Sequence, residues 1–549
     1  MLYGRYKNVP TTDTMPNLSN VYTYQPAITY GIKPGDNITT TLPTVTDNVG
    51  IKAGEYYITS SIEVNANIYF APGARLIISD GVIVTFTGNV AGQPFQIFSG
   101  GNVRFKGNTV VYPEWFGAIT YGEGETPVDA STAMQAAVDS LEYTGGCVVL
   151  QPGRYEDIGD NEEYAPAAGC YYIERPVEIR HSNISFGCFS GSKTMIFSNS
   201  VPALIVGGEN WVESVTVHDI MLYSLDDIAT AMYVSNTARS EVRDVRIFKY
   251  YTGVRVSKTV NQHFVRVEVS PFLANMTDTT CFYIDDAPVG NISPNASMVF
   301  DRCLANMYGC GAGATGWHFT GDDMRDCLLS NCETAAGEIG YYFDGSASQA
   351  SQQIGMDIRL DGCIADQFTD CGIKLYNCHN AIVTVNGGYF SGAVASHNCI
   401  FIRDTNNVTV TGVQFQGDTG IANDYCGVNT TLSTGTVVTG CQFLNCREGV
   451  RVTAGIATVS NNDFVCKSNP LTNPALSLLI AITCENVDNQ GGGAVISGNV
   501  FHNDGIFSYS VAISTITSSV PSIITGNYIG NYTVVYNADD VVANNIGGE

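Results

Sequence analysis

A short motif recurs along most of this 549-residue chain and constrains the fold more than any other feature. Copies read VRDVRIF from Val242, FDRCLAN from Phe300, LDGCIAD from Leu360 and VTGCQFL from Val438. They follow one another at intervals of about 20 to 40 residues, which is typical of a solenoid built from stacked repeats. The fourth residue of each copy marks a column that consists of Ile220, Val245, Val267, Cys303, Cys327, Cys363, Gly388, Val413, Cys441, Asn462, Asn499 and Asn527.

The pattern inside each copy indicates β-strands. Apolar and polar residues alternate within the motif, and Gly, Asn, Asp and Thr cluster between copies. A second short strand follows in each repeat, for example GVRV from Gly253, GYYF from Gly340 and GIKL from Gly372. We therefore predict an all-β protein, a right-handed, single-stranded parallel β-helix whose fourth motif position stacks inward. A β-sandwich with coincidental spacing is the alternative.

Composition narrows the function classes. The chain carries 52 acidic and 26 basic residues and shows no basic stripe, which argues against nucleic-acid binding. It has no run of 18 apolar residues and no signal-peptide pattern, so we expect no membrane association. The 17 Cys lack the spacing of a zinc site, and several fall on the inward column. We expect reduced core thiols made in a cytosol, and neither a metal nor another cofactor.

The residue pattern, and with it the expected secondary structure, changes several times along the chain. Residues 1–19 have no periodicity and suggest an N-terminal arm, and residues 20–110 suggest a small β-domain or irregular coils. Residues 111–180 hold the one convincing helix, DASTAMQAAVDSLEY from Asp129, with a cap at Asp129 or Ser131 and an end at Gly145. We expect this helix to cap the hydrophobic column at the entry to the β-helix of residues 181–549. No separate C-terminal domain is recognisable.

The segment around this helix resembles a known family. The resemblance rests on Tyr112, Pro113, Glu114, Trp115, Phe116, Gly117 and Ala118, then Ala133, Gln135, Ala136 and Ala137, then Gly145, Gly146, Val148, Leu150, Pro152, Gly153 and Tyr155. These residues resemble the opening of the pectate-lyase-like β-helix in bacteriophage tailspikes and capsule depolymerases. The chain departs from the family at Gly122-Glu123-Gly124, where the family usually has Gly-Asp-Gly, so we expect a remodelled loop there.

The resemblance implies a homotrimeric protein of the phage tail, synthesised in the host cytoplasm. It implies attachment to the tail, or to another tail protein, through the N-terminus. It also implies binding and cleavage of a bacterial surface polysaccharide, either a capsule or an O-antigen. Leu304, Leu328 and Ile364 hold the fifth motif position, and alternation would point them outward as an aliphatic stripe that needs a partner. A local bulge that turns them inward is the alternative.

Chemistry on such a fold belongs on an outward face. The residue between the two inward positions of the second strand defines an outward column of Tyr233, Arg255, Tyr283, His318, Tyr342, Lys374, Phe401, Ala422 and Arg451. Adjacent strands lie about 4.8 Å apart, so the column predicts a ladder of rings and cations with the spacing of a sugar chain. We expect the substrate contacts to be Arg255, Tyr283, Asp285, His318, Tyr342 and Lys374. The alternative is that Tyr and Phe are merely good strand residues.

Carboxylates are dense beside this column. Glycoside hydrolysis needs one protonated and one ionised carboxyl group. We expect the pair within a pool of Asp322, Asp323, Asp326, Glu333, Glu338 and Asp344. Asp285 and Asp344 each directly follow a second strand two coils apart, which places their backbones roughly 9.6 Å apart and favours an inverting mechanism. Asp323 and Asp326 offer a closer pair.

Two other functions remain open from the sequence. A uronic-acid polymer could be cut by β-elimination, with His318, Tyr342 or Lys374 as the base and Arg255 or Lys374 neutralising the sugar carboxylate. A non-catalytic fibre could bind polysaccharide through the same ladder and cut nothing. The product distinguishes these functions, because a lyase leaves an unsaturated sugar, a hydrolase leaves only reducing ends, and a non-catalytic fibre leaves neither.

Overall fold

The computed structural model divides the chain into two compact units, Met1–Phe248 and Lys249–Glu549. The structure describes residues 24–107, 110–122, 125–157, 164–188, 192–199, 201–226, 229–272, 276–285, 295–321, 323–345, 355–379, 381–392, 398–417, 426–466, 480–487, 490–503, 511–515, 520–530 and 533–547. The predicted N-terminal arm, residues 1–19, lies outside these residues.

The first unit begins with short parallel coils. The strands are β2 (Val49–Ile51), β3 (Gly54–Ile58), β4 (Ile62–Val64), β5 (Ile68–Phe70), β6 (Ala74–Ile78), β7 (Ile83–Phe86), β8 (Val90–Gly92), β9 (Phe98–Ser99) and β10 (Asn102–Phe105). They pair in parallel as β2-β5-β8, β3-β6-β9 and β4-β7-β10. The region thus already has a three-sided coil, with alternate side chains such as Tyr56 and Ile58 buried inside.

The helix α1 (Ser131–Asp139) is shorter than the sequence suggested. Ala130 holds the N-cap position without a side-chain hydrogen bond, so neither predicted cap residue occupies it. Asp129 instead accepts the backbone N–H of Ser131 at 2.8 Å and acts just before the helix. The apolar face of α1 is buried at Met134 and Val138, and the helix contacts β10 and β16 (Val177–Ile179). It therefore contacts strands of both the early and the later coils of this unit.

After α1 the first unit continues as a parallel β-helix. One row of paired strands is β16, β19 (Leu204–Val206) and β23 (Thr230–Ala238). A second row is β12 (Gly146–Leu150), β17 (Ile184–Cys188), β21 (Thr216–His218) and β24 (Glu241–Arg243). A third row is β15 (Tyr171–Ile173), β18 (Thr194–Ser198), β22 (Ile220–Ser224) and β25 (Arg246–Phe248).

The second unit repeats this arrangement of three rows over its described residues. The first row is β26 (Thr252–Val260), β29 (Thr280–Asp285), β33 (Thr315–Thr320), β36 (Ile339–Asp344), β39 (Cys371–Tyr376), β42 (Asn398–Arg403), β45 (Cys426–Thr431), β48 (Glu448–Thr453), β51 (Ile480–Val487), β55 (Val511–Ser514) and β58 (Thr533–Val535). The second row is β27 (His263–Val265), β31 (Val299–Asp301), β34 (Asp323–Ser330), β37 (Gly355–Asp361), β40 (Ile382–Asn386), β43 (Val408–Thr411), β46 (Thr434–Thr439), β49 (Ile456–Ser460), β53 (Gly493–Ser497), β56 (Ile523–Thr525) and β59 (Val541–Ala543). The third row is β28 (Glu268–Ser270), β32 (Leu304–Asn306), β35 (Glu333–Ala335), β38 (Ile364–Phe368), β41 (Tyr389–Gly392), β44 (Gln414–Gln416), β47 (Gln442–Leu444), β50 (Asp463–Cys466), β54 (Val500–Asn503), β57 (Tyr528–Gly530) and β60 (Ile546–Gly547).

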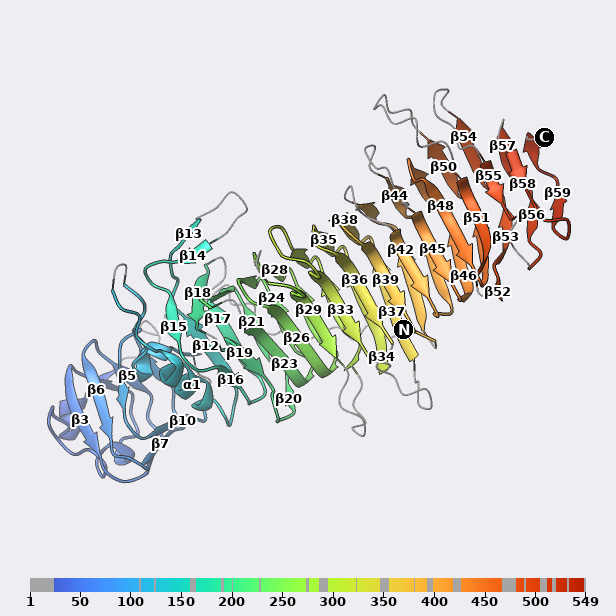
Figure 1. The fold of residues 1–549 in the computed structure, drawn as a ribbon. Coiled ribbons are helices and arrows are strands. Elements are labelled where there is room, and N and C mark those ends of the chain that lie inside the picture. The colour runs from blue at the N-terminus through green and yellow to red at the C-terminus, as the bar shows by residue number, and fades with distance from the viewer. Residues whose placement is uncertain are drawn as a thin grey trace. The chain divides into compact units, whose positions relative to one another are not determined.

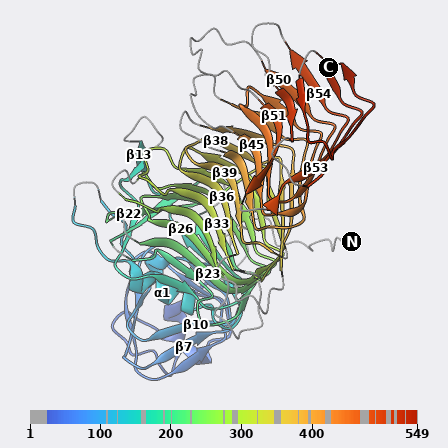
Figure 2. The same ribbon diagram turned by 45° about the vertical axis from the view of Figure 1, so that its right-hand side comes forward.

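These rows confirm the parallel β-helix. The arrows of β33, β36 and β39 lie side by side and run in the same direction in both views (Figures 1 and 2). The recurring motif forms the bend from the second row to the third. Its third residue takes a left-handed conformation, with φ of 56° at Asp244, 64° at Gly362 and 56° at Asn461. Asp, Asn and Gly tolerate this conformation best, which explains their frequency in the motif.

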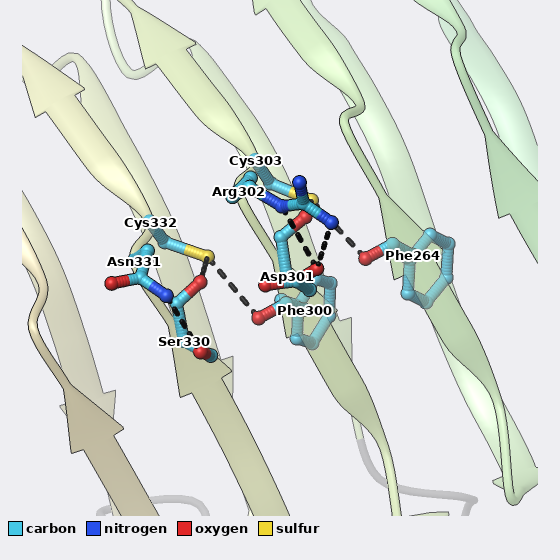
Figure 3. Close-up of polar contacts among 8 residues, drawn as sticks. All are labelled: Phe264, Phe300, Asp301, Arg302, Cys303, Ser330, Asn331 and Cys332. Atoms are coloured by element: carbon cyan, nitrogen blue, oxygen red, sulfur yellow. Dashed lines mark hydrogen bonds and ion pairs between the residues drawn. The ribbon is translucent and has the colours of Figure 1, made fainter.

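The fourth residue of the motif turns inward, as predicted, and its side chain satisfies the backbone of the preceding coil. The thiol of Cys303 donates to the carbonyl oxygen of Phe264 at 3.4 Å, and the thiol of Cys332 donates to that of Phe300 at 3.3 Å (Figure 3). The rings of Phe264 and Phe300 stack beneath, with centroids 4.8 Å apart. The thiols of the column therefore bond to the backbone of the same residues whose rings stack in the core.

One register prediction within this column was wrong. Cys332, not Cys327, continues the column, because β34 contains a register shift between Met324 and Cys327. The same shift breaks the predicted aliphatic stripe. Leu328 pairs with Val299 in the second row, whereas Glu333 holds the third-row position between Leu304 and Ile364. The motif letters alone do not reveal the shift, since MRDCLLS keeps the same pattern.

Towards the end of the second unit, amides replace thiols in the inward column. The side chain of Asn499 donates to the carbonyl oxygen of Val459 at 2.9 Å and to the side-chain oxygen of Asn527 at 3.0 Å. Its own side-chain oxygen accepts the backbone and side-chain N–H groups of Asn462, each at 3.0 Å. Asn499 is fully buried, so this ladder pairs polar groups that burial would otherwise leave unsatisfied.

Candidate functional site

The predicted ladder occupies the outward side of the first row in the second unit. The register aligns Arg255, Tyr283, His318, Tyr342, Lys374, Phe401, Asn429 and Arg451 on successive strands. Asn429 takes the place that the sequence reading assigned to Ala422, which lies outside the described residues. Tyr233 belongs to the first unit, where it pairs with Ile205. The ladder residues of the second unit are therefore brought together by strand register.

A stack of large rings supports the ladder from inside. Phe282, Trp317 and Tyr341 precede the outward residues on their strands and are completely buried. The ring centroids of Phe282 and Trp317 are 4.7 Å apart, and those of Trp317 and Tyr341 are 5.0 Å apart. The Tyr341 hydroxyl also donates to the carbonyl oxygen of Cys332 at 2.9 Å. Such packing fixes the backbone that carries the outward side chains.

The outward rings contact one another and end in cations. His318 and Tyr342 stack with centroids 4.7 Å apart and an angle of 15° between their planes. Tyr283 meets the His318 ring edge-on at 5.3 Å. Arg255 lies 5.6 Å from the Tyr283 ring centre, and Lys374 lies 5.4 Å from that of Tyr342. This strip presents aromatic faces flanked by positive charge, a combination suited to sugar rings and their hydroxyl or carboxylate groups.

A second outward column carries the carboxylates. It runs through Asp285, Thr320 and Asp344, which hold one register position on β29, β33 and β36. Two strand spacings separate the backbones of Asp285 and Asp344, or about 9.6 Å. The short side chain of Thr320 lies between them. Two carboxyl groups thus lie beside the ring ladder with a small residue in the gap.

Asp285 combines burial with a cationic partner. Its Oδ2 accepts a hydrogen bond from Arg255 Nε at 2.9 Å, while its Oδ1 is buried without a partner among the described residues. Burial raises the pKa of the Asp285 carboxyl above its ordinary value, and the hydrogen bond and charge of Arg255 oppose that rise. Burial is the larger effect, so the structure favours the protonated acid more than water does.

Asp344 interacts with the ring ladder. Burial first, and then the charge and hydrogen bond of Asp344, raise the pKa of the Tyr342 hydroxyl well above its usual range. Tyr342 therefore stays protonated and donates to the carboxylate. Burial lowers the pKa of His318, and the charge of Asp344 opposes this effect. His318 Nε2 is buried and has no hydrogen-bond partner among the described residues, so a neutral imidazole faces this column.

The other predicted carboxylates are dispersed. Asp322 lies outside the described residues, and only the backbone of Asp323, the first residue of β34, is described. Asp326 is exposed on the second row, where its charge adds to burial in raising the pKa of Asp357. Glu333 is exposed on the third row, and Glu338 accepts the backbone N–H of Gly313 at 2.7 Å.

Glu338 and Asp344 lie at opposite ends of β36. Glu338 directly precedes the strand and Asp344 ends it, so about 20 Å of extended chain separates them. Among the predicted carboxylates whose side chains the structure describes, Asp285 and Asp344 are the two beside the ladder. The separation follows from the extended strand, because each residue adds about 3.3 Å, so two carboxylates close in sequence lie far apart at its two ends.

Sequence reasoning missed residues that extend the site. Tyr376 and Arg403 continue the carboxylate column on β39 and β42, with the guanidinium 5.7 Å from the ring centre. Glu448 is buried next to Arg451 and accepts a hydrogen bond from Thr483 at 3.1 Å. Burial raises the pKa of Glu448, against the effect of Arg451. Tyr376 and Arg403 could have been found from the sequence, because they come two residues after Lys374 and Phe401 and so share their face of the strand.

The structure has further features outside the ladder residues. A polar hollow of about 980 Å³ in the first unit is lined by α1 and by Arg175, Glu178 and Arg180, and contains none of the predicted site residues. Within the described part of the chain, no group of three or more His, Cys, Asp or Glu side chains is placed to hold a metal ion. Among the described residues, no helix is long and apolar enough to cross a membrane.

Comparison with known proteins places the fold. No protein-family model and no curated protein matches the sequence. Tailspike protein 3 of bacteriophage CBA120 matches in structure with a TM-score of 0.52 at 14% identity, over 75% of this chain and 63% of the tailspike. A surface adhesin of Streptococcus pneumoniae, PfbA, matches with a TM-score of 0.47 at 11% identity, over 65% and 91% of the two chains. A tailspike of Acinetobacter phage vb_AbaP_AS12 matches with a TM-score of 0.42 at 13% identity, over 74% and 67%.

The match to the CBA120 tailspike carries the structural conclusion. The match covers 75% of this chain and 63% of the length of that protein. Identity at this level relates folds and not residue roles. The chain thus has a parallel β-helix fold that is also found in phage tailspikes.

Proposed function

We propose that this protein is a phage tailspike that binds a bacterial surface polysaccharide along the first-row ladder and cleaves it by glycosidic hydrolysis. The observation that carries the proposal is the column Asp285–Thr320–Asp344 beside the ladder Tyr283–His318–Tyr342. The fold shared with the CBA120 tailspike supports the same proposal. The polymer is a capsule or an O-antigen, and the virion tail is the location.

The two carboxyl groups take different roles. Asp285 acts as the general acid, because burial raises its pKa and favours the protonated form. Its proton goes to the glycosidic oxygen as the bond to the sugar carbon breaks. Asp344, with a hydrogen bond from Tyr342, acts as the base that takes a proton from the attacking water. The backbone separation of about 9.6 Å, near the upper end of the roughly 6.5–9.5 Å between the carboxyl groups of inverting enzymes, leaves room for that water and favours inversion at the anomeric carbon.

The ladder binds the polymer. The faces of Tyr283, His318 and Tyr342 stack on the C–H surfaces of successive sugars, while Arg255 and Lys374 hold hydroxyl or carboxylate oxygens. Asp322, Asp323, Asp326, Glu333 and Glu338 stay alternative carboxylates in this proposal. Asp322 and Asp323 rank first among them, because they come only two and three residues after Thr320, the last residue of the strand β33 that also carries His318.

The proposal is tested on purified capsules and O-antigens from a panel of strains. We expect shorter oligosaccharides with new reducing ends from one polymer, no increase in near-ultraviolet absorbance, and inversion seen by nuclear magnetic resonance. D285N and D344N should lose cleavage but keep binding. Binding without cleavage of any polymer would contradict the enzymatic function and would indicate a non-catalytic fibre.

One observation favours a second chemistry. His318 presents a buried Nε2 without a described partner and a lowered pKa, as a neutral general base would. On a uronic-acid polymer it could remove the proton next to the carboxylate, which Lys374 or Arg255 would neutralise. A product with an unsaturated sugar, seen as absorbance in the near ultraviolet, would support a lyase over a hydrolase.

We also propose that the protein assembles as a homotrimer, with residues 1–19 contacting the phage tail or another tail protein. Support comes from an exposed aliphatic stripe of Val495, Ile523 and Val541, which register aligns on β53, β56 and β59. Exposed fractions of 37%, 45% and 58% leave these side chains available to a second copy. Light scattering on V495E and I523E should show loss of the trimer, and an unchanged mass would contradict this contact.

A further inference from the structure

A hydrogen-bonded chain of Ser, His and Asp lies on the second row of the first unit. Ser185 Oγ is 3.0 Å from His218 Nε2. His218 Nδ1 is 2.9 Å from Asp219 Oδ2. A proton on Nδ1 satisfies both contacts at once, because Nδ1 then donates to the carboxylate and Nε2 accepts from the hydroxyl. This is the order of contacts in which an imidazole activates a serine.

The local backbone builds this arrangement. Ser185 and Gly187 lie on the outward side of β17, and Gly187 is paired with His218 on β21. A Cβ at Gly187 would lie 1.9 Å from the carbonyl oxygen of His218 and 3.0 Å from its Nδ1, so the glycine allows the close approach of both the backbone and the imidazole of His218. Asp219 takes the left-handed conformation of the motif, with φ of 53°, which turns its carboxylate onto the ring of the preceding residue.

Burial separates the orienting groups from the reactive one. His218 and Asp219 are each only 8% exposed, whereas Ser185 is half-buried and open to solvent. A shielded Asp–His pair keeps its hydrogen bond from competition with water, and the serine stays accessible to a substrate. The strand pairing by itself does not require Ser, His and Asp at these positions, because Arg243 on the next strand, β24, takes the position of His218.

We propose that Ser185, His218 and Asp219 form a second catalytic site that hydrolyses short acyl esters. Ser185 Oγ forms a bond to the ester carbonyl carbon and gives its proton to His218 Nε2. The bond from that carbon to the alkoxy oxygen breaks, and the proton on Nε2 passes to the leaving alcohol. Water then attacks the acyl-serine with His218 as the base, and releases the carboxylic acid and free Ser185. Asp219 holds the proton on Nδ1 throughout and is a positioning residue.

The surroundings select a small acyl group. Cys147 is paired with Ser185 on β12, and Val149 is paired with Gly187, so short side chains flank the hydroxyl on this face. The polar hollow of the first unit does not include these residues. An acetyl-sized ester on an exposed alcohol fits such a surface better than a long acyl chain does. Burial raises the pKa of the Cys147 thiol more than a hydrogen bond with Ser185 lowers it, which disfavours the nucleophilic thiolate.

The experiment labels the unmodified full-length protein with a fluorophosphonate, which reacts with activated serines. We expect the mass of one adduct, mapped to the peptide that contains Ser185. On p-nitrophenyl acetate, S185A and H218Q should each reduce turnover at least about a hundredfold, and D219N at least about tenfold. Asn accepts the left-handed conformation of Asp219, so D219N keeps the fold.

The matched control is T216V. Thr216 is paired with Ser185 on the same face but has no part in the hydrogen-bonded chain, and Val keeps its shape and strand preference. T216V should label and turn over like the unmodified protein. An adduct elsewhere, no adduct at all, or a turnover in S185A equal to that of the unmodified protein would overturn the proposal. Labelling does not depend on how any variant folds.

Discussion

Arg255 and Asp285 form an ion pair across neighbouring strands, with Arg255 Nε 2.9 Å from Asp285 Oδ2. The pair lies at the point where the ring ladder meets the carboxylate column. Arg255 is about half exposed, whereas Asp285 is largely buried, so the carboxyl experiences both the cation and a low dielectric. The balance of these two influences sets the protonation of the proposed acid.

The pH dependence of cleavage follows from this pair. An acid must be protonated to work, so kcat/KM should fall as pH rises through the raised pKa of Asp285. Arg255 opposes the rise, and R255Q should therefore move this alkaline limb to higher pH. Rates over a pH series on the cleaved polymer check the shift. A limb that moves to lower pH, or does not move, would contradict the role of Asp285.

Removal of either carboxyl group should abolish cleavage and spare binding. D285N and D344N keep the size of the side chain, and we expect each to lower kcat about 10²–10⁴-fold. D301N is the matched control, because Asp301 pairs with Arg302 on the second row and lies off the ladder. Reducing-end assays and polymer binding are measured together. Full activity in both site variants would exclude this column as the catalytic one.

The amide ladder should contribute strongly to stability. N499A removes a fully buried side chain and with it the hydrogen bonds that Asn499 makes to the backbone and side-chain N–H groups of Asn462 and to the carbonyl oxygen of Val459. We expect a cost of about 2–4 kcal/mol, seen as a lower denaturant midpoint. N386A, at an exposed position, should cost no more than about 0.5 kcal/mol. Equal midpoints for the two variants would show that the ladder is not a stabilising element.

Two glycines of the motif test the inward column. Gly388 has φ of 96°, and a Cβ there would lie 2.1 Å from the carbonyl oxygen of Cys363. G388A should therefore lower the unfolding free energy by about 2–4 kcal/mol. Gly412 also has a positive φ, of 64°, but its Cβ would meet nothing closer than 3.9 Å. G412A should cost only about 1–2 kcal/mol, and thermal midpoints compare the two.

The sequence by itself determined the parallel β-helix, its inward column and the alignment from Arg255 to Phe401. These follow from local rules, because alternation and left-handed turn residues repeat in each coil whatever surrounds them. Where the local pattern stayed the same but the register shifted, as between Met324 and Cys327, the sequence misplaced Cys332 and Leu328.

Only the tertiary structure decided which polar groups meet. It separated Glu338 from Asp344 by the length of a strand, and it paired Arg255 with Asp285 on the adjacent coil. It also brought Ser185 next to His218, because their strands β17 and β21 are far apart in sequence but adjacent in the second row. Such contacts depend on which coil stacks on which and in what register, and burial then sets the protonation of each group. No local pattern encodes those distances.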